Sequence, residues 1–438
     1  MASDSRDMNR SHLERARKVL PGGVTTAARF DKSLGRPFFI SRGEGSRLYD
    51  LDGKPYIDMN TSFGAALMGH GHPKIREALN RAGQMGIACA TEFPEQVELA
   101  EKVCAAVPSA EMVRFTLSGT ETTWYIVRLA RLFTGRKKII KIEGHFHGYN
   151  DYLQFNYWPK PGEGLPAVRP ETPGFPEESA DNIIVLPFND PGALEETIRQ
   201  RGGEIAAVIM EPVNYNSGCI MPGDGYLRKV RDITAGNGIL LVFDEILSGF
   251  RTGPDCMQGY YGVTPDICAL GKALGGGAPL SAFAGRRDIM SLIAPEGRMM
   301  HSGTYNANAV GILCGNAFMD AAAEKDAYPP LLTRSSRLYE GMNAAFAGAR
   351  MPAEVKGLGC RFGILFGASA GATPLSYADV AGQDWDMAYA FFREAFRRGV
   401  FFNGGWHHGI SFAHSDDDVS RVIQVCGEAA QAVMSNRK

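Results

Sequence analysis

The sequence lacks the features that would place this chain in a membrane, outside the cell or on nucleic acid. No apolar run approaches the length of a membrane span, and the charged N-terminal stretch has no apolar core like that of a secretory signal. With 46 basic and 48 acidic residues the formal net charge is only −2, so no global field favours nucleic acid or an anionic membrane. We expect a cytoplasmic protein whose partners are small molecules.

Cysteine-pair and metal motifs are also missing. The eight cysteines contain no Cys-x-x-Cys, which argues against a disulfide framework and a zinc ribbon. The histidine pairs at 70/72, 145/147 and 407/408 include no His-Glu-x-x-His, so we expect turn or packing histidines and no metal. We expect the cysteines to be reduced and mostly buried: Cys89, Cys104, Cys219, Cys256, Cys268, Cys314, Cys360 and Cys426.

Nucleotide-binding motifs are absent as well. The chain has no Gly-x-x-x-x-Gly-Lys-Ser/Thr, and "GLGCRFG" at 357 to 363 has the wrong glycine spacing and comes too late for an opening dinucleotide unit. This disfavours a nucleotide-binding module.

The sequence does contain the pattern of an α/β protein. A helix is predicted from Ser11, where Glu14 completes a capping box, to the stop at 21 to 23, and hairpin-like alternation follows over 37 to 59. From about residue 95, short apolar runs alternate with segments of helical period, which predicts a parallel sheet with crossover helices. The predicted strands are 112 to 117, 137 to 142, 182 to 188, 205 to 211, 239 to 245 and 266 to 270.

Composition and pattern together predict more than one core. The 438 residues, 45% of them apolar and 21% charged, suit a large globular chain. We predict a large domain with a mostly parallel sheet flanked by helices, and a smaller, discontinuous α+β domain built from both termini. The expected division is 1–65 for the N-terminal segment of the small domain, 66–318 for the large domain and 319–438 for the C-terminal part of the small domain. A helix is predicted to start near Ser415.

The first candidate site is "RFTLSGTETTW", where a strand ends and a helix begins at once. Free backbone N–H groups and the positive helix end favour an anion there, Gly119 allows close approach, and the hydroxyls of Ser118 and Thr120 add donors. A phosphate suits this turn. An ordinary helix cap is the alternative.

The second is "ILLVFDEILSGFR", which places Asp244 and Glu245 at the C-terminal end of a buried strand, where open α/β sheets bind ligands. A buried carboxylate is costly unless something positive or protonated meets it. A metal or a protonated ring nitrogen would serve, and the alternative is a structural ion pair, for instance with Arg251.

The third is "CALGKALGGGAPLSAFAGR", which sets Lys272 among glycines and small residues, 28 positions after Asp244. Such surroundings leave room for a flat ring, and desolvation would lower the pKa of the amine. A surface lysine beside a flexible turn is the alternative. Together, a phosphate cradle, a buried carboxylate and a desolvated lysine at strand ends are what pyridoxal 5'-phosphate requires.

The chain resembles the fold-type I, class III pyridoxal phosphate-dependent aminotransferases over nearly its whole length. The matching motifs are "RGEGSRLYDLDGKPYIDM", "GHGHPKI", "FTLSGTET", "EGHFHGYND", "MEPV", "LLVFDEILSGFR", "PDICALGKALGGGAPLSAFAGRRDIM" and "HSGTYNANA". Within the class, "ISFAHSDDDV" and "GHFHG" are most similar to the branch of glutamate semialdehyde aminomutase and β-amino-acid aminotransferases.

The resemblance implies roles for individual residues. Lys272 would form a Schiff base with the cofactor and shuttle the substrate proton, and Asp244 would bind the ring nitrogen. The other cofactor-binding residues would be Ser118, Gly119 and Thr120 at the phosphate, Phe146 stacked on the ring, Asn216 near the ring hydroxyl with Glu211 behind it, and Thr304, reaching the phosphate from the partner subunit of a homodimer.

Substrate recognition is less defined. The resemblance places Arg29 near a carboxylate-binding arginine of the branch, with a solvent-exposed loop arginine as the alternative. His408, in "GGWHHGISFAH", lies where the chain departs from both relatives, because aminomutases tend to carry an acidic residue there and β-amino-acid enzymes an arginine. His408 is a second candidate for substrate contact.

The expected function is therefore amino transfer, from an amine or amino acid, including β-amino or aryl amino acids, to a keto acid. An intramolecular 2,1-aminomutase that uses the same residues is the alternative. A nucleotide-binding module without covalent chemistry would need the phosphate cradle but not Lys272.

Overall fold

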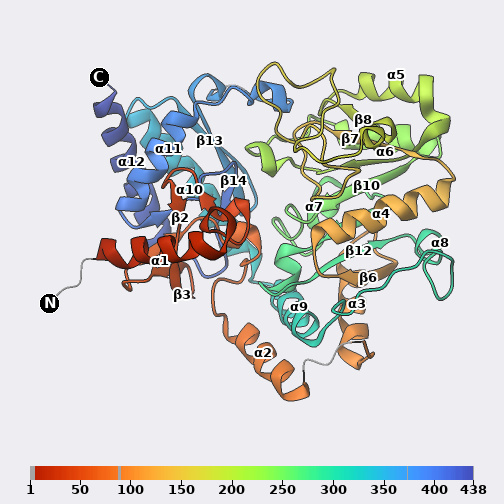
Figure 1. The fold of residues 1–438 in the computed structure, drawn as a ribbon, viewed down its shortest axis with the longest axis horizontal. Coiled ribbons are helices and arrows are strands. Elements are labelled where there is room, and N and C mark those ends of the chain that lie inside the picture. The colour runs from red at the N-terminus through yellow and green to blue at the C-terminus, as the bar shows by residue number, and fades with distance from the viewer. Residues whose placement is uncertain (1–4, 87–89, 372, 438) are drawn as a thin grey trace.

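A seven-stranded sheet forms the centre of the larger half of the molecule. The computed structural model describes residues 5–86, 90–371 and 373–437 (Figure 1). The strand order is β6-β12-β11-β10-β9-β7-β8. All neighbours pair in parallel except β12, which is antiparallel to both β11 and β6. The strands are β6 (Met112–Thr116), β7 (Lys138–Ile142), β8 (Ile183–Leu186), β9 (Ile205–Met210), β10 (Leu240–Glu245), β11 (Ile267–Leu270) and β12 (Ser281–Gly285).

Six of these strands confirm the predicted ones, each within two residues of its expected ends. The seventh, β12, has no counterpart among the predicted strands. Its residues, "SAFAG", are mainly serine, alanine and glycine, and they provided little of the β-branched signal on which strand prediction depends.

Helices cover both faces of this sheet. On one face, α4 contacts β6, β9, β11 and β12, and on the other, α6 packs against β10 and α5 (Figure 1). Every residue of β9 and of β10 is buried, which explains their unbroken apolar runs. The helices of this half are α2 (Pro73–Met85), α3 (Pro94–Ala106), α4 (Gly119–Thr134), α5 (Pro191–Arg201), α6 (Tyr226–Gly236), α7 (Cys256–Tyr261), α8 (Arg287–Met290) and α9 (Ala309–Ala322).

The second half is built from both ends of the chain. In Figure 1 the red N-terminal and blue C-terminal segments lie on the same side of the molecule. A four-stranded sheet joins them, because β15 pairs in parallel with β5, and Ser46 and Arg47 both donate hydrogen bonds to Asp418. The division at residues 65 and 318 stays a prediction. The remaining elements are α1 (Ser5–Val19), β1 (Phe30–Asp31), β2 (Arg36–Pro37), β3 (Ile40–Glu44), β4 (Arg47–Asp50), β5 (Pro55–Asp58), α10 (Tyr328–Gly348), β13 (Ala353–Leu358), β14 (Arg361–Phe366), α11 (Trp385–Arg397), β15 (Val400–Phe401), β16 (His408–Gly409) and α12 (Asp416–Asn436).

The two predicted helix starts have different outcomes. Ser415 caps α12 as expected, since its hydroxyl accepts from the N–H of Asp418, whose carboxylate accepts in return from the N–H of Ser415. The expected start at Ser11 is wrong, because α1 already begins at Ser5. Glu14 instead accepts from Arg10 one turn earlier, so Ser11 lies within the helix.

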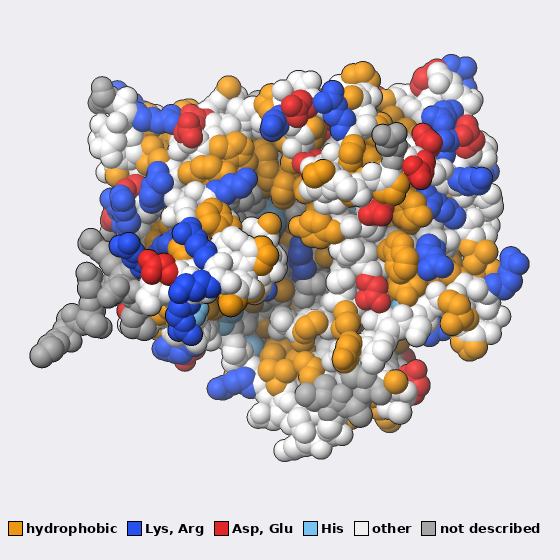
Figure 2. Space-filling model, in the orientation of Figure 1, with side chains coloured by type: hydrophobic (Ala, Val, Ile, Leu, Met, Phe, Trp, Pro, Cys, Tyr) orange, Lys and Arg blue, Asp and Glu red, His pale blue; other side chains and the backbone are white. Residues whose placement is uncertain are grey.

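The distribution of surface charge and the state of the cysteines are as the sequence predicts. Figure 2 shows basic and acidic side chains scattered over one face rather than gathered in one patch. Seven cysteines are free, six of them buried, whereas Cys89 lies outside the described residues. Within the described ranges, no helix is both long and apolar enough to cross a membrane.

Candidate active site

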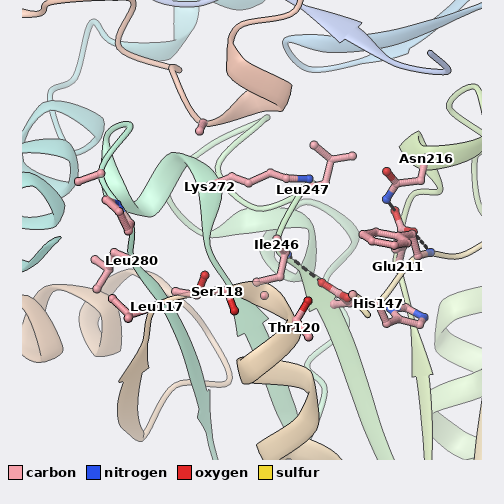
Figure 3. A pocket seen from close by; sticks show the side chains of 18 residues that line it. Leu117, Ser118, Thr120, His147, Glu211, Asn216, Ile246, Leu247, Lys272 and Leu280 are labelled. Carbon is pink, nitrogen blue, oxygen red and sulfur yellow. Dashed lines mark hydrogen bonds and ion pairs between the residues drawn. The ribbon is translucent and has the colours of Figure 1, made fainter. Parts of the chain in front are cut away.

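A cavity of about 280 Å³ lies at the carboxyl edge of the seven-stranded sheet (Figure 3). The strands β6, β7, β9, β10 and β11 all end at this edge, because they run in the same direction and only β12 is reversed. The structure brings eight of the eleven predicted site residues together in its lining: Ser118, Gly119, Thr120, Phe146, Glu211, Asn216, Asp244 and Lys272.

One end of the cavity is formed by the N-terminus of α4. Ser118 caps this helix, and its hydroxyl accepts from the N–H of Glu121 at 3.2 Å. The N–H groups of Gly119 and Thr120 lie in the first turn, so they have no carbonyl within the helix to bind. A Cβ on Gly119 would lie 3.3 Å from three atoms of the Ile246 side chain, so a larger residue would crowd Ile246. These groups form an anion-binding helix end of the kind that a phosphate fits.

Asp244, near the end of β10, is held by a histidine from another strand end. Its Oδ2 lies 2.7 Å from Nδ1 of His147, and its Oδ1 accepts from the N–H of Ile246 at 3.0 Å. Because an ionised carboxylate only accepts, His147 donates through Nδ1, which leaves Nε2 without a proton. Burial lowers the pKa of His147, and the bond to Asp244 opposes that shift. His147 thus orients a carboxylate that is only 3% exposed.

Glu211 and Asn216 form a second polar group on the same edge. Glu211 accepts from the N–H of Phe146 at 2.8 Å and from the amide of Asn216 at 2.9 Å. Burial, followed by the charge of Asp244, raises the pKa of Glu211 to about 8. Glu211 is therefore protonated near neutral pH, and it orients the Phe146 backbone and the Asn216 side chain without adding a negative charge. The ring of Phe146 is partly buried, and it lies 6.4 Å from the parallel ring of Trp158.

Lys272 follows β11 in a backbone conformation that is rare for any residue but glycine. Its φ is 46°, in the left-handed region, and such strain clusters at functional sites. Burial lowers the pKa of its amine to about 7, and the positive charges of Arg361 and Arg251 add to the shift. A substantial fraction of the amine is then unprotonated near neutral pH, and this is the form that attacks an aldehyde.

Three predicted residues lie outside the lining of this cavity. Thr304 is exposed in the segment between β12 and α9, and Arg29 is exposed with its guanidinium bound to the hydroxyl of Thr25. His408 is fully buried in β16, with its ring 5.2 Å from that of Phe392. The single chain does not bring these three side chains to the cavity.

Glu245, the neighbour of Asp244, has a structural role. It accepts from the N–H of Met257 and the amide of Gln258, at 2.6 and 2.9 Å. The alternative of an ion pair with Arg251 is wrong, since Arg251 donates to two backbone carbonyls instead.

Sequence reasoning missed His147 as a site residue. It was interpreted as a turn or packing histidine, because nothing local links it to Asp244, 97 residues later. The only available signal was its place just beyond a predicted strand of the same parallel sheet, where side chains from different strand ends meet.

Comparisons with known proteins agree with this geometry. The family described as Aminotransferase class-III matches residues 30–408. The chain is 39% identical over 419 residues to glutamate-1-semialdehyde 2,1-aminomutase of Nitrosospira multiformis, covering 95% of this chain and 97% of the relative.

Solved structures also match over almost the full length. An omega-transaminase from Sphaerobacter thermophilus superposes with a TM-score of 0.91 and 33% identity, covering 97% of both chains. A β-phenylalanine aminotransferase from Variovorax paradoxus gives a TM-score of 0.86 and 30% identity, covering 97% of this chain and 94% of that one.

Proposed function

Because this chain belongs to the class-III aminotransferases, a family of pyridoxal phosphate enzymes, we propose that it moves an amino group on an amine or amino acid through Lys272. The observation that carries the proposal is the meeting of three groups at one cavity: the α4 N-terminus, the carboxylate of Asp244 and the amine of Lys272. No two of these groups are close in sequence, so their convergence is specific.

The residues present fit the cofactor. The first-turn N–H groups of α4, with the Ser118 and Thr120 hydroxyls, would hold the phosphate. Asp244, oriented by His147, would hold a protonated ring nitrogen, which is the positive partner that a buried carboxylate requires. When bound, the cofactor supplies an aldehyde for amine exchange and a ring that takes up electron density from the substrate carbon.

The chain's own contribution is proton movement and exclusion of water. Lys272, with its lowered pKa, would accept the proton from the substrate carbon that carries the amino group and would return it to the carbon of the cofactor's aldehyde group. Ala65, Leu247 and Leu280 line the cavity with apolar surface and limit the entry of water.

Two reactions use this machinery. The similarity to glutamate-1-semialdehyde 2,1-aminomutases favours the isomerase, in which donor and acceptor carbons belong to one molecule. This was the alternative suggested by the sequence. The intermolecular aminotransferase, with an amine donor and a keto acid acceptor, is the second candidate. The Trp406-His407-His408 stretch, which departs from the aminomutase pattern, supports it.

The exposed position of Thr304 supports a homodimer as the catalytic unit. Thr304 lies away from the cavity of its own chain, and a partner's copy of this segment would bring a hydroxyl to the phosphate. Molecular mass in solution tests the dimer. A Thr304→Ala variant should retain the dimer and lose cofactor on dialysis faster than the wild type, and a monomeric wild type with full cofactor retention would contradict the assignment.

Borohydride reduction tests the role of Lys272. The cofactor should be trapped covalently on a peptide containing Lys272, identified by mass spectrometry, while Lys272→Ala should trap none and be inactive. Lys229→Ala, which removes an exposed lysine of α6, is the matched control. Full activity of the Lys272→Ala variant would refute the proposal.

Turnover of candidate amines with and without an added keto acid separates the two reactions. An aminomutase converts a single substrate when the enzyme is supplied in the amine form of the cofactor. An aminotransferase needs pyruvate, 2-oxoglutarate or another acceptor for net turnover.

A further inference from the structure

Two buried arginines lie beside the cavity without a carboxylate partner. Arg251 and Arg361 are each only 1% exposed. Arg251 donates to the carbonyls of Leu247 and Gly64, and Arg361 donates to the hydroxyl of Thr61 at 2.9 Å. In the described part of the chain, neither guanidinium is within ion-pair distance of an Asp or Glu.

The two guanidinium groups also lie close to each other. The position of a Cβ on Gly64 would be 2.9 Å from Nη2 of Arg251 and 3.0 Å from Nη1 of Arg361. Burying two like charges together is costly unless an anion neutralises them. The Nε–H of Arg361 is buried and has no acceptor among the described residues. An anionic ligand would neutralise the charge and accept from this donor.

This arginine pair borders the cavity. The third neighbour of the same Gly64 position, at 3.2 Å, is Leu247, and both Leu247 and Ala65 line the cavity. The pair is also close enough to Lys272 that its charge opposes protonation of that amine. Arg361 begins β14, Arg251 lies in the segment after β10, and both approach Gly64 of η3 (Ser62–Gly64). The pair is therefore separate from the helix end that suits the cofactor phosphate.

The loop that packs on the arginines is strained. Thr61, Ser62 and Phe63 all have left-handed φ values, of 50°, 54° and 54°. Left-handed residues other than glycine are energetically costly, and they cluster at active sites and ligand clamps.

His407 adds a hydrogen-bond donor beside the arginine pair. Nη2 of Arg361 lies 2.5 Å from Nδ1 of His407. Because a guanidinium only donates, Nδ1 is the acceptor, and the proton of the neutral imidazole is on Nε2. His407 keeps 8% of its surface exposed, whereas His408 keeps none. His407 is therefore the histidine of this stretch that is able to offer an N–H to a ligand.

We propose that Arg361 and His407, with Arg251 behind them, bind a carboxylate of the substrate next to Lys272. This rests on the proposed function and specifies its substrate class as an amine that carries an acidic group. The subsite differs from the earlier candidates: Arg29 is exposed and bonded to Thr25, and His408 is fully buried beside Phe392.

Binding of an unreactive probe to the purified holoenzyme tests the subsite. Glutarate carries the carboxylates, and glutaramide has the same skeleton without charge. In titration calorimetry, the wild type should bind glutarate more tightly than glutaramide. Arg361→Met should weaken the binding of glutarate about tenfold or more, as expected for the loss of a charge-assisted pair. The affinity for glutaramide should stay within about twofold of the wild-type value. Arg361→Lys should retain part of the affinity for glutarate that Arg361→Met loses. His407→Phe should weaken the binding of glutarate several-fold.

Controls separate this effect from misfolding and from failure of the proposed function. Arg199→Met, which removes an exposed charge on α5, should bind glutarate as the wild type does. Melting temperature and absorbance of the bound cofactor report whether each variant is folded and loaded. Absence of borohydride trapping would refute the proposed function but leave the glutarate comparison valid. A loaded Arg361→Met variant with wild-type affinity for glutarate would overturn the subsite, as would selective loss of that affinity in Arg29→Met.

Discussion

Replacement of Lys272 by methionine should stabilise the cofactor-free protein. In the wild type the pKa of this amine is lowered from 10.5 to about 7 by burial and by neighbouring arginines. The unfolded chain therefore binds the proton more tightly than the folded chain does. Above pH 10.5 the amine is neutral in both states, and its titration costs the folded protein no stability. As the pH falls from 10.5 to about 7, the folded protein loses stability relative to the unfolded chain, and below pH 7 this contribution changes little.

The magnitude follows from the two pKa values. Linkage gives a cost of about 4 kcal/mol at pH 7 and about 2 kcal/mol at pH 9 for keeping this lysine buried. Methionine has a similar length and no charge, so Lys272→Met should remove that cost. We expect the free energy of unfolding of the cofactor-free variant to exceed that of the cofactor-free wild type by up to about 4 kcal/mol at pH 7, and by about half as much at pH 9.

Urea unfolding of both stripped proteins at the two pH values measures the difference. Lys229→Met, on the exposed face of α6, is the matched control and should show no such pH-dependent gain. If the wild type were the more stable protein at pH 7, or if the gain were equal at both pH values, the lowered pKa of the Lys272 amine would be refuted.

Three further substitutions probe the neighbouring groups. Gly119→Val places a branched side chain 3.3 Å from Ile246, and the displaced helix start should lower cofactor retention on dialysis, measured by absorbance; unchanged retention would contradict the cradle. His147→Leu leaves the buried carboxylate of Asp244 with only the N–H of Ile246 as a donor and should cost about 3 kcal/mol of stability in thermal unfolding, whereas a wild-type melting temperature would contradict the pairing. Gly64→Ala combines a φ of +90° with contacts to both guanidinium groups, so it should lower stability and weaken glutarate binding; an unaltered glutarate affinity would disagree with the packing described here.

The sequence by itself determined the local elements and the types of group at their ends. Six strands were predicted because buried parallel strands are unbroken apolar runs, and the start of α12 because its cap is complete within four residues. The phosphate cradle, Asp244 and Lys272 were recognisable for the same reason: each is a short pattern around a strand end. Local signals failed where the pattern was ambiguous, as at Ser11, or where small residues carried little strand preference, as in β12.

Only the tertiary structure decided which distant groups meet. The pairing of His147 with Asp244 depends on the order of β7, β9 and β10 in the sheet, which no local pattern specifies. The group of Arg361 and His407 likewise requires the end of the chain to pack on a loop near its beginning. Burial then sets the charge of each group, because the protonation of a side chain depends on the solvent and charges around it, and these come from segments hundreds of residues apart.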